Sequence, residues 1–244
     1  MISSYKFRHS CSSFFRAAYI LVGALAPLVA QQTGEKLVKV NQVAQITDAV
    51  LISDVSIAGK PIECGLYVKP PAVVQPFTPF QAGTDWFQQM TISLVNRTSK
   101  TIVFGALIFH FLDTGDCRSG PCVGVDLELG QRPAIDAYDQ RSGKPLQPEH
   151  PERPPLDWKS EQTLVIHVSD YMPDFEGRLA NYLPVTNISK VNISRGPFYF
   201  EDGMEWSLGK FSVPDPDHHG EFKQLPPNYF PGRTGHNWPP GYNQ

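Results

Sequence analysis

The sequence predicts an all-β protein folded as an antiparallel β-sandwich, immunoglobulin-like in outline, with Pro-rich loops and an extended C-terminal tail. Charged residues make up only 18% of the 244 residues, whereas 23 Pro and 19 Gly supply turns. This balance is typical of short strands joined by loops, and the scarcity of helical periodicity agrees with it. Hydrophobic residues, at 41%, are numerous enough to form a core. An irregular barrel is the alternative architecture.

The N-terminal segment 1–30 has the order of a secretory signal peptide. A positively charged start without acidic residues is followed at 17–30 by the apolar run AAYILVGALAPLVA. This run is too short for a transmembrane helix, which needs about 20 residues. We therefore expect cleavage after Ala30 and a secreted or periplasmic protein with no stable membrane span. An uncleaved anchor is the alternative.

Export also changes the charge of the chain. Removal of the three basic residues of the signal peptide leaves 18 basic against 24 acidic residues, a net charge near −6. A mildly acidic chain without basic runs argues against nucleic acid and anionic membranes as partners. The sequence contains no phosphate loop, dinucleotide fingerprint or zincin helix motif, so no cofactor is expected.

The remaining length favours a single sandwich domain over 31–213, followed by a Pro/Gly-rich tail over 214–244. The first segments of this domain are a strand or short helix within 31–49, where Leu37, Val38 and Val40 are apolar, and a strand at 51–57. The turn Gly59-Lys60-Pro61 then leads into a strand at 62–68. Several prolines between 70 and 79 mark a loop or an irregular edge, because proline cannot donate to a strand ladder.

The strongest local pattern lies at 86–112. Apolar and polar residues alternate along 86–95, and the polar segment 96–100 separates this run from 101–112, which is rich in β-branched and aromatic residues. Two such runs around a short polar turn predict an antiparallel hairpin. The second run is apolar on both faces, which places it in the middle of a sheet or beneath another sheet.

The second half of the domain is predicted from the same signals. We interpret 113–130 as a loop containing Gly and Asp, and 140–157, with five prolines, as an exposed connector. Further elements follow in order: a strand at 161–169, a short helix at 171–183, a strand at 185–194 with its continuation at 196–201, and a strand at 204–213. Asp202-Gly203, between the last two, is a preferred hairpin turn.

Three cysteines remain after loss of the signal peptide. Cys117 and Cys122 bracket the turn-forming tetrapeptide Arg-Ser-Gly-Pro, so an oxidising compartment favours a disulfide between them. Such a short loop constrains the unfolded chain little, and the bond would fix a loop rather than the fold. Cys64 is then left over, either buried and inert or available for pairing between chains.

The run Phe111-Leu112-Asp113-Thr114-Gly115 resembles the active-site triplet of aspartic proteases. Those enzymes need two facing aspartates that share one proton, so a single copy of the triplet would require a homodimer. Asp116, moreover, stands where that family has a small residue. A Gly-containing loop at the end of a strand is the favoured interpretation of Asp113.

A second candidate site lies near the C-terminus. Asp215, Asp217, His218 and His219 offer two carboxylates and two imidazoles as metal ligands. No spaced set of ligands completes a coordination shell, so a solvated turn is the favoured alternative.

Other polar residues within strands have structural interpretations. His110 and His167 lie inside predicted strands and are interpreted as structural histidines. The glycosylation sequons at Asn96, Asn187 and Asn192 are interpreted as chance occurrences.

Two blocks of sequence, TISLVNRTSKTIVFGALIFHF and FYFEDGMEWSLGKFSVPDP, resemble uncharacterised exported proteins of soil bacteria of the acidobacterial type. The resemblance covers about half of the mature chain. It implies a single β-sandwich domain behind a signal peptide, and it brings no known activity. It also suggests a structural anchor in which the turn Asp202-Gly203 ends one strand and Trp206 fixes the next against the core.

These observations lead to a functional expectation. The sequence favours a non-enzymatic exported module that binds an unknown protein or an envelope component, because loop-rich sandwiches often carry recognition loops. The alternative is a hydrolase or metal-dependent enzyme that uses Asp113 or the Asp215–His219 cluster. A purely structural accessory to a larger assembly is a third possibility.

Overall fold

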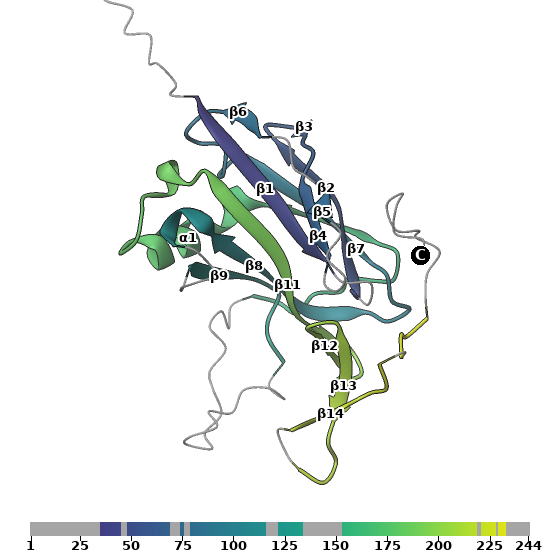
Figure 1. Cartoon of the computed structure of the whole chain (residues 1–244). Coiled ribbons are helices and arrows are strands. Elements are labelled where there is room, and N and C mark those ends of the chain that lie inside the picture. The colour runs from purple at the N-terminus through teal and green to yellow at the C-terminus, as the bar shows by residue number, and fades with distance from the viewer. Residues whose placement is uncertain are drawn as a thin grey trace, which may run out of the picture. The chain divides into compact units, whose positions relative to one another are not determined.

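The computed structural model shows a fold built mostly of β-strands that form two sheets (Figure 1). The predicted signal peptide 1–30 and the last part of the predicted tail lie outside the described residues. The structure describes residues 35–44, 48–68, 74–75, 79–115, 122–133, 153–218, 221–227 and 229–232.

The larger sheet is mixed. Its central strand β1 (Lys36–Ala44) runs parallel to both β11 (Lys190–Phe200) and β4 (Gly65–Val68), whereas its other pairings are antiparallel. The prediction of a wholly antiparallel sandwich is therefore wrong for this sheet. The remaining strands of this sheet are β5 (Val74–Gln75), β6 (Phe80–Ala82), β8 (Ile102–Phe111), β9 (Val123–Leu129), β12 (Glu205–Ser207), β13 (Lys210–Pro214) and β14 (Phe222–Gln224).

The smaller sheet is antiparallel and has the strand order β10-β7-β2-β3. Its strands are β2 (Val50–Ile57), β3 (Lys60–Pro61), β7 (Met90–Asn96) and β10 (Thr163–His167). Apolar residues from both sheets form one buried core, which also includes α1 (Met172–Leu179) through Met172, Phe175 and Leu179. The short 3-10 helices are η1 (Leu112–Thr114), η3 (Val168–Tyr171) and η4 (Val185–Asn187).

Phe87 links the helix to the larger sheet within this core. Its ring centroid lies 5.5 Å from that of Phe111, 5.9 Å from that of Phe109 and 4.9 Å from that of Phe175, all in edge-to-face contacts. Aromatic pairs of this geometry add about 0.5–1.5 kcal/mol each beyond their burial. The segment that precedes β7 is therefore fixed to the helix and to β8 at the same time.

The predicted hairpin at 86–112 does not form. Both runs are strands, but β7 pairs with β2 and β10, whereas β8 pairs with β11 and β9 in the other sheet. Segment 96–100 therefore crosses from one sheet to the other. Its buried residues include Asn96, Arg97 and Thr98, which an exposed hairpin turn would leave in solvent.

The predicted hairpin at Asp202-Gly203 is confirmed. β11 and β12 pair antiparallel with Phe198 opposite Trp206, and Gly203 has φ of +81°, a conformation that favours glycine. The predicted strand 204–213 is divided in two, because Leu208 and Gly209, with φ of +49° and +82°, form a second tight turn between β12 and β13.

Two further predictions are corrected. Residues 123–129 form β9 rather than part of a loop, with Val125, Leu127 and Leu129 buried. Residues 185–187 form η4, and strand β11 begins only at Lys190. Of the two alternatives for the first segment of the domain, the strand is confirmed as β1.

The predicted helix at 171–183 is confirmed in shorter form as α1. No helix among the described residues is long and apolar enough to span a membrane.

Candidate functional site

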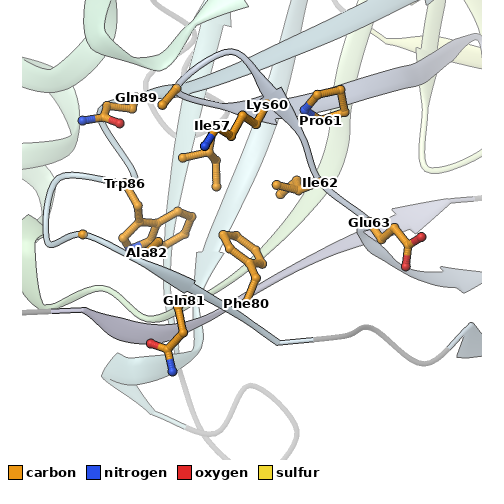
Figure 2. Close-up of a pocket in the computed structure, with 12 residues that line it drawn as sticks. Ile57, Lys60, Pro61, Ile62, Glu63, Phe80, Gln81, Ala82, Trp86 and Gln89 are labelled. Atoms are coloured by element: carbon orange, nitrogen blue, oxygen red, sulfur yellow. The ribbon is translucent and has the colours of Figure 1, made fainter.

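A pocket of about 490 Å³ opens where the β2–β3 hairpin lies near β6 and the turn that follows it (Figure 2). Ligand pockets commonly have volumes of about 300–1,000 Å³. The pocket therefore has the size of a site for a small molecule. Sequence reasoning did not identify it, because its walls come from strands of two different sheets.

The upper wall is shaped by the tight turn between β2 and β3. Ile57 pairs with Lys60, and the two residues between them, Ala58 and Gly59, have φ of +51° and +74°. Both residues adopt the left-handed backbone conformation, which is typical of a two-residue hairpin turn. The Ala58 N–H donates to the carbonyl of Gln89 at 3.1 Å, which ties the turn to the segment before β7.

The apolar walls meet at Trp86. Its side chain is buried, and the indole Nε1 donates to the carbonyl of Ile188 at 2.8 Å, so the ring is held in one orientation. Ile57, Ile62 and Phe80 surround the same space, and Figure 2 shows these three side chains directed toward one another and toward Trp86. This arrangement can exclude water from the apolar part of a ligand.

The rim of the pocket is polar and exposed. Among the residues that line it, Lys60 is basic and Glu63 is acidic, while Gln81 and Gln89 contribute amides. In Figure 2 the Lys60 side chain extends toward Ile57, whereas the Glu63 carboxylate is directed away from the apolar centre. A ligand at the apolar walls would therefore meet a positive charge at the mouth.

Cys64 follows the pocket residue Glu63 and is a free thiol. Burial raises the pKa of this thiol to about 11. A side-chain hydrogen bond with Gln42 lowers the pKa, and the negative charge of Asp54 raises it further. At neutral pH the group is therefore protonated and a poor nucleophile. Cys117 lies outside the described residues, so its disulfide with Cys122 stays a prediction.

Asp113 fixes a strand rather than standing free for catalysis. Its Oδ2 accepts hydrogen bonds from the backbone N–H groups of Ser189 at 2.6 Å and Lys190 at 2.8 Å, and its Oδ1 accepts from the Ser189 hydroxyl at 2.7 Å. Both oxygens are thus engaged at the start of β11. This geometry agrees with the interpretation of Asp113 as part of a structural turn, and Asp116 lies outside the described residues.

The described members of the C-terminal cluster form a compact turn. Asp215 Oδ1 accepts the Asp217 N–H at 2.9 Å, and Oδ2 lies 3.2 Å from His218 Nδ1. The Asp217 N–H and then His218 lower the pKa of Asp215, and Asp215 in turn raises the pKa of His218. His219 lies outside the described residues. Within the described parts of the chain, no group of three or more His, Cys, Asp or Glu side chains is placed to hold a metal.

Both strand histidines lie beside hydroxyl groups. His110 Nε2 is 3.2 Å from Ser194 Oγ, and His167 Nδ1 is 3.3 Å from Thr91 Oγ1. Ser194 lies opposite Ile108 in the antiparallel pairing of β11 with β8. Both histidines lie within strands, as the sequence predicts, with His110 on β8 and His167 on β10.

The residues of the predicted anchor surround the β11–β12 turn. Trp206 is buried, and its ring centroid lies 5.8 Å from that of Phe198. Asp202 accepts the Met204 N–H at 3.3 Å and forms an ion pair with Lys100. These contacts connect the turn to the crossover between the sheets.

A buried polar cluster at that crossover was also missed by sequence reasoning. Arg195, 5% exposed, lies with its Nε 3.5 Å from Asp48 Oδ2, and its guanidinium donates to the carbonyls of Val43 at 2.6 Å and Val50 at 3.3 Å. Arg97 Nη1 donates to the Asp48 carbonyl at 3.3 Å. These contacts join β1, β2 and β11, and their role is architectural.

Comparison of this chain with protein-family models, curated proteins and solved structures finds no match. Function therefore has to follow from the chemistry of the chain itself. Of the candidate sites, the pocket at Trp86 combines a fixed apolar wall, open access and a polar rim.

Proposed function

We propose that this protein is an exported, non-enzymatic binding module that holds its ligand in the pocket at Trp86. The observation that carries the proposal is the pocket itself, in which Trp86, Phe80, Ile57 and Ile62 form apolar walls below an exposed polar rim. Concave, mainly apolar sites with a few polar groups are the usual form of small-molecule sites.

The setting of the pocket supports this function. Two sheets packed through one core make a rigid frame, and the sandwich outline we propose for it is immunoglobulin-like. The residues that line the pocket come from short strands and turns at the end of this frame, a common position for recognition. The apolar run at 17–30 supports export, and the resemblance to exported acidobacterial-type proteins agrees with it. An envelope component or another exported protein is the class of partner we propose for the module as a whole.

The binding site is tested with a neutral apolar probe, N-phenyl-1-naphthylamine, whose fluorescence rises in an apolar site. We expect saturable binding at one probe per chain. Ala82→Leu adds three carbons to the half-buried wall of the pocket and should weaken binding at least fivefold. Ala180→Leu, at an exposed position near α1, is the matched control and should leave binding unchanged.

Two results would contradict the proposal. One is no saturable binding by the unmodified protein. The other is equal binding by the protein and by a folded Ala82→Leu variant. Because Ala82 lies on β6, which pairs only with β1 among the described strands, thermal unfolding should first confirm that the variant is folded.

A further inference from the structure

We infer that the ligand of this pocket is a small amphipathic carboxylic acid, with its apolar body against Phe80 and Ile62 and its carboxylate at Lys60. The inference rests on the proposed function and adds the chemical class of the ligand. It follows from three features of the pocket: the nature of its walls, the placement of charge at its mouth, and the strand that borders it.

The walls select an apolar body. Trp86 is 1% exposed and Ile57 is 8% exposed, so both form the closed back of the pocket. The apolar surface that a ligand can contact belongs to the half-buried side chains of Ile62, Phe80 and Ala82. A ring as deeply covered as that of Trp86 cannot offer an open face for stacking on a sugar. Burial of alkyl groups here is favourable by about 25 cal/mol per Å² of apolar surface removed from water.

The charge at the mouth selects an anion. Among the described residues that line the pocket, Lys60 is the only basic one, and its side chain extends toward Ile57 (Figure 2). Glu63 is the only acidic residue among the same described lining residues, and its carboxylate is directed away from the apolar side chains. One ammonium group matches one carboxylate. Arginine supplies the bidentate geometry that favours phosphate, and no arginine is among the described residues that line the pocket.

The bordering strand selects a small molecule over a peptide. β3 consists of Lys60 and Pro61 only, and it pairs with β2. Proline has no backbone N–H, so this edge cannot continue a full ladder with an added peptide strand. An acid with an alkyl or aryl body needs no such ladder, because its affinity comes from apolar burial and a single ionic contact.

The test compares octanoate with 1-octanol, which have the same number of carbon atoms and differ in the charge of the head group, by isothermal titration calorimetry. We expect octanoate to bind about 1.4–5-fold more tightly, the range that an exposed ion pair supplies. Lys60→Gln should remove this preference and leave octanol binding unchanged. Lys223→Gln, an exposed lysine on β14, is the matched control and should keep the preference.

Ionic strength gives a second readout. The preference for octanoate should shrink as salt rises, because the screening length falls from about 30 Å at 0.01 M to about 3 Å at 1 M. Equal binding of both ligands, or a preference that survives in Lys60→Gln, overturns the assignment of the ligand class while the proposed function stands. Absence of binding by octanoate, octanol and the neutral naphthylamine probe overturns both.

Discussion

Replacement of Asn96 by Ala should cost this fold several kcal/mol, although it removes only a short side chain. Asn96 is fully buried at the crossover between the two sheets. Its Nδ2 donates to the carbonyl of Lys100 at 2.7 Å and to that of Trp158 at 3.1 Å. Its Oδ1 accepts the Thr98 N–H at 3.0 Å and the Thr98 hydroxyl at 2.8 Å.

The size of the effect follows from which groups keep a partner. The Trp158 carbonyl still accepts from the Ile102 N–H, and the Lys100 carbonyl from the Thr98 hydroxyl. The Thr98 N–H loses its partner, and an orphaned buried donor costs about 1–3 kcal/mol. Each of the other three lost hydrogen bonds contributes about 0.5–1.5 kcal/mol, so simple addition gives a total loss of about 2.5–7.5 kcal/mol.

Urea unfolding measures this loss as a decrease of the midpoint at unchanged m-value. Asn192→Ala is the matched control, because Asn192 is half-buried and its amide oxygen accepts one hydrogen bond, from Asn41 at 2.8 Å. We expect it to cost less than about 1 kcal/mol. An Asn96→Ala variant as stable as this control would refute the buried crossover and favour the exposed hairpin turn that the sequence pattern suggests.

Other predictions concern single residues outside the pocket. Leu208→Asn should stabilise the protein by about 0.5–1 kcal/mol in thermal unfolding, because Leu208 is 74% exposed and has φ of +49°, and a loss of stability would contradict the turn geometry. The Cys64 thiol should react slowly with a disulfide reagent at pH 8 and faster as pH approaches 11, since burial raises its pKa to about 11; rapid reaction of the folded protein at pH 8 would be inconsistent with that burial. Asp113→Asn should lower the free energy of unfolding by about 1 kcal/mol, because it removes an acceptor for the N–H groups at the start of β11. An unchanged free energy of unfolding would contradict the structural role of Asp113.

The sequence predicted which segments are strands better than it predicted their partners. The apolar pattern of the two segments, alternating along 86–95 and nearly continuous along 101–112, indicates that each is buried on at least one face, and both contain strands. It does not report whether the short connection returns within a sheet or crosses to another. That choice depends on the buried hydrogen bonds of Asn96 and Thr98, which have no sequence signature of their own.

Turns were predictable where the residue type demanded the conformation. Asp202-Gly203 gave a correct hairpin because glycine adopts a positive φ without strain. Leu208-Gly209 was missed because leucine rarely occupies the first position of such a turn. Strand β9 was missed although Val125, Leu127 and Leu129 alternate with polar residues, because the neighbouring cysteines and glycines suggested a loop.

The candidate site could not be predicted from the sequence for a related reason. The turn at Gly59-Lys60-Pro61 was recognised, and so was the apolar character of the segment that begins at Trp86. Nothing in either segment indicates that the two meet, because their approach depends on how the smaller sheet packs against β6 of the larger one. The chemical motifs that did attract attention, at Asp113 and at Asp215–His218, form structural hydrogen bonds instead, to the start of β11 and within a turn.

The most direct test of the binding site is a titration of the methyl-labelled protein with octanoate, followed by NMR. We predict saturable shifts of the Ile57, Ile62 and Ala82 methyl signals together with the Trp86 indole N–H, all with one dissociation constant. The signals of Ala180 and Leu183, at the separate pocket of about 340 Å³ beside α1, should stay in place. Shifts confined to those two residues, or no saturable shift at the Trp86 pocket, would contradict the proposed site.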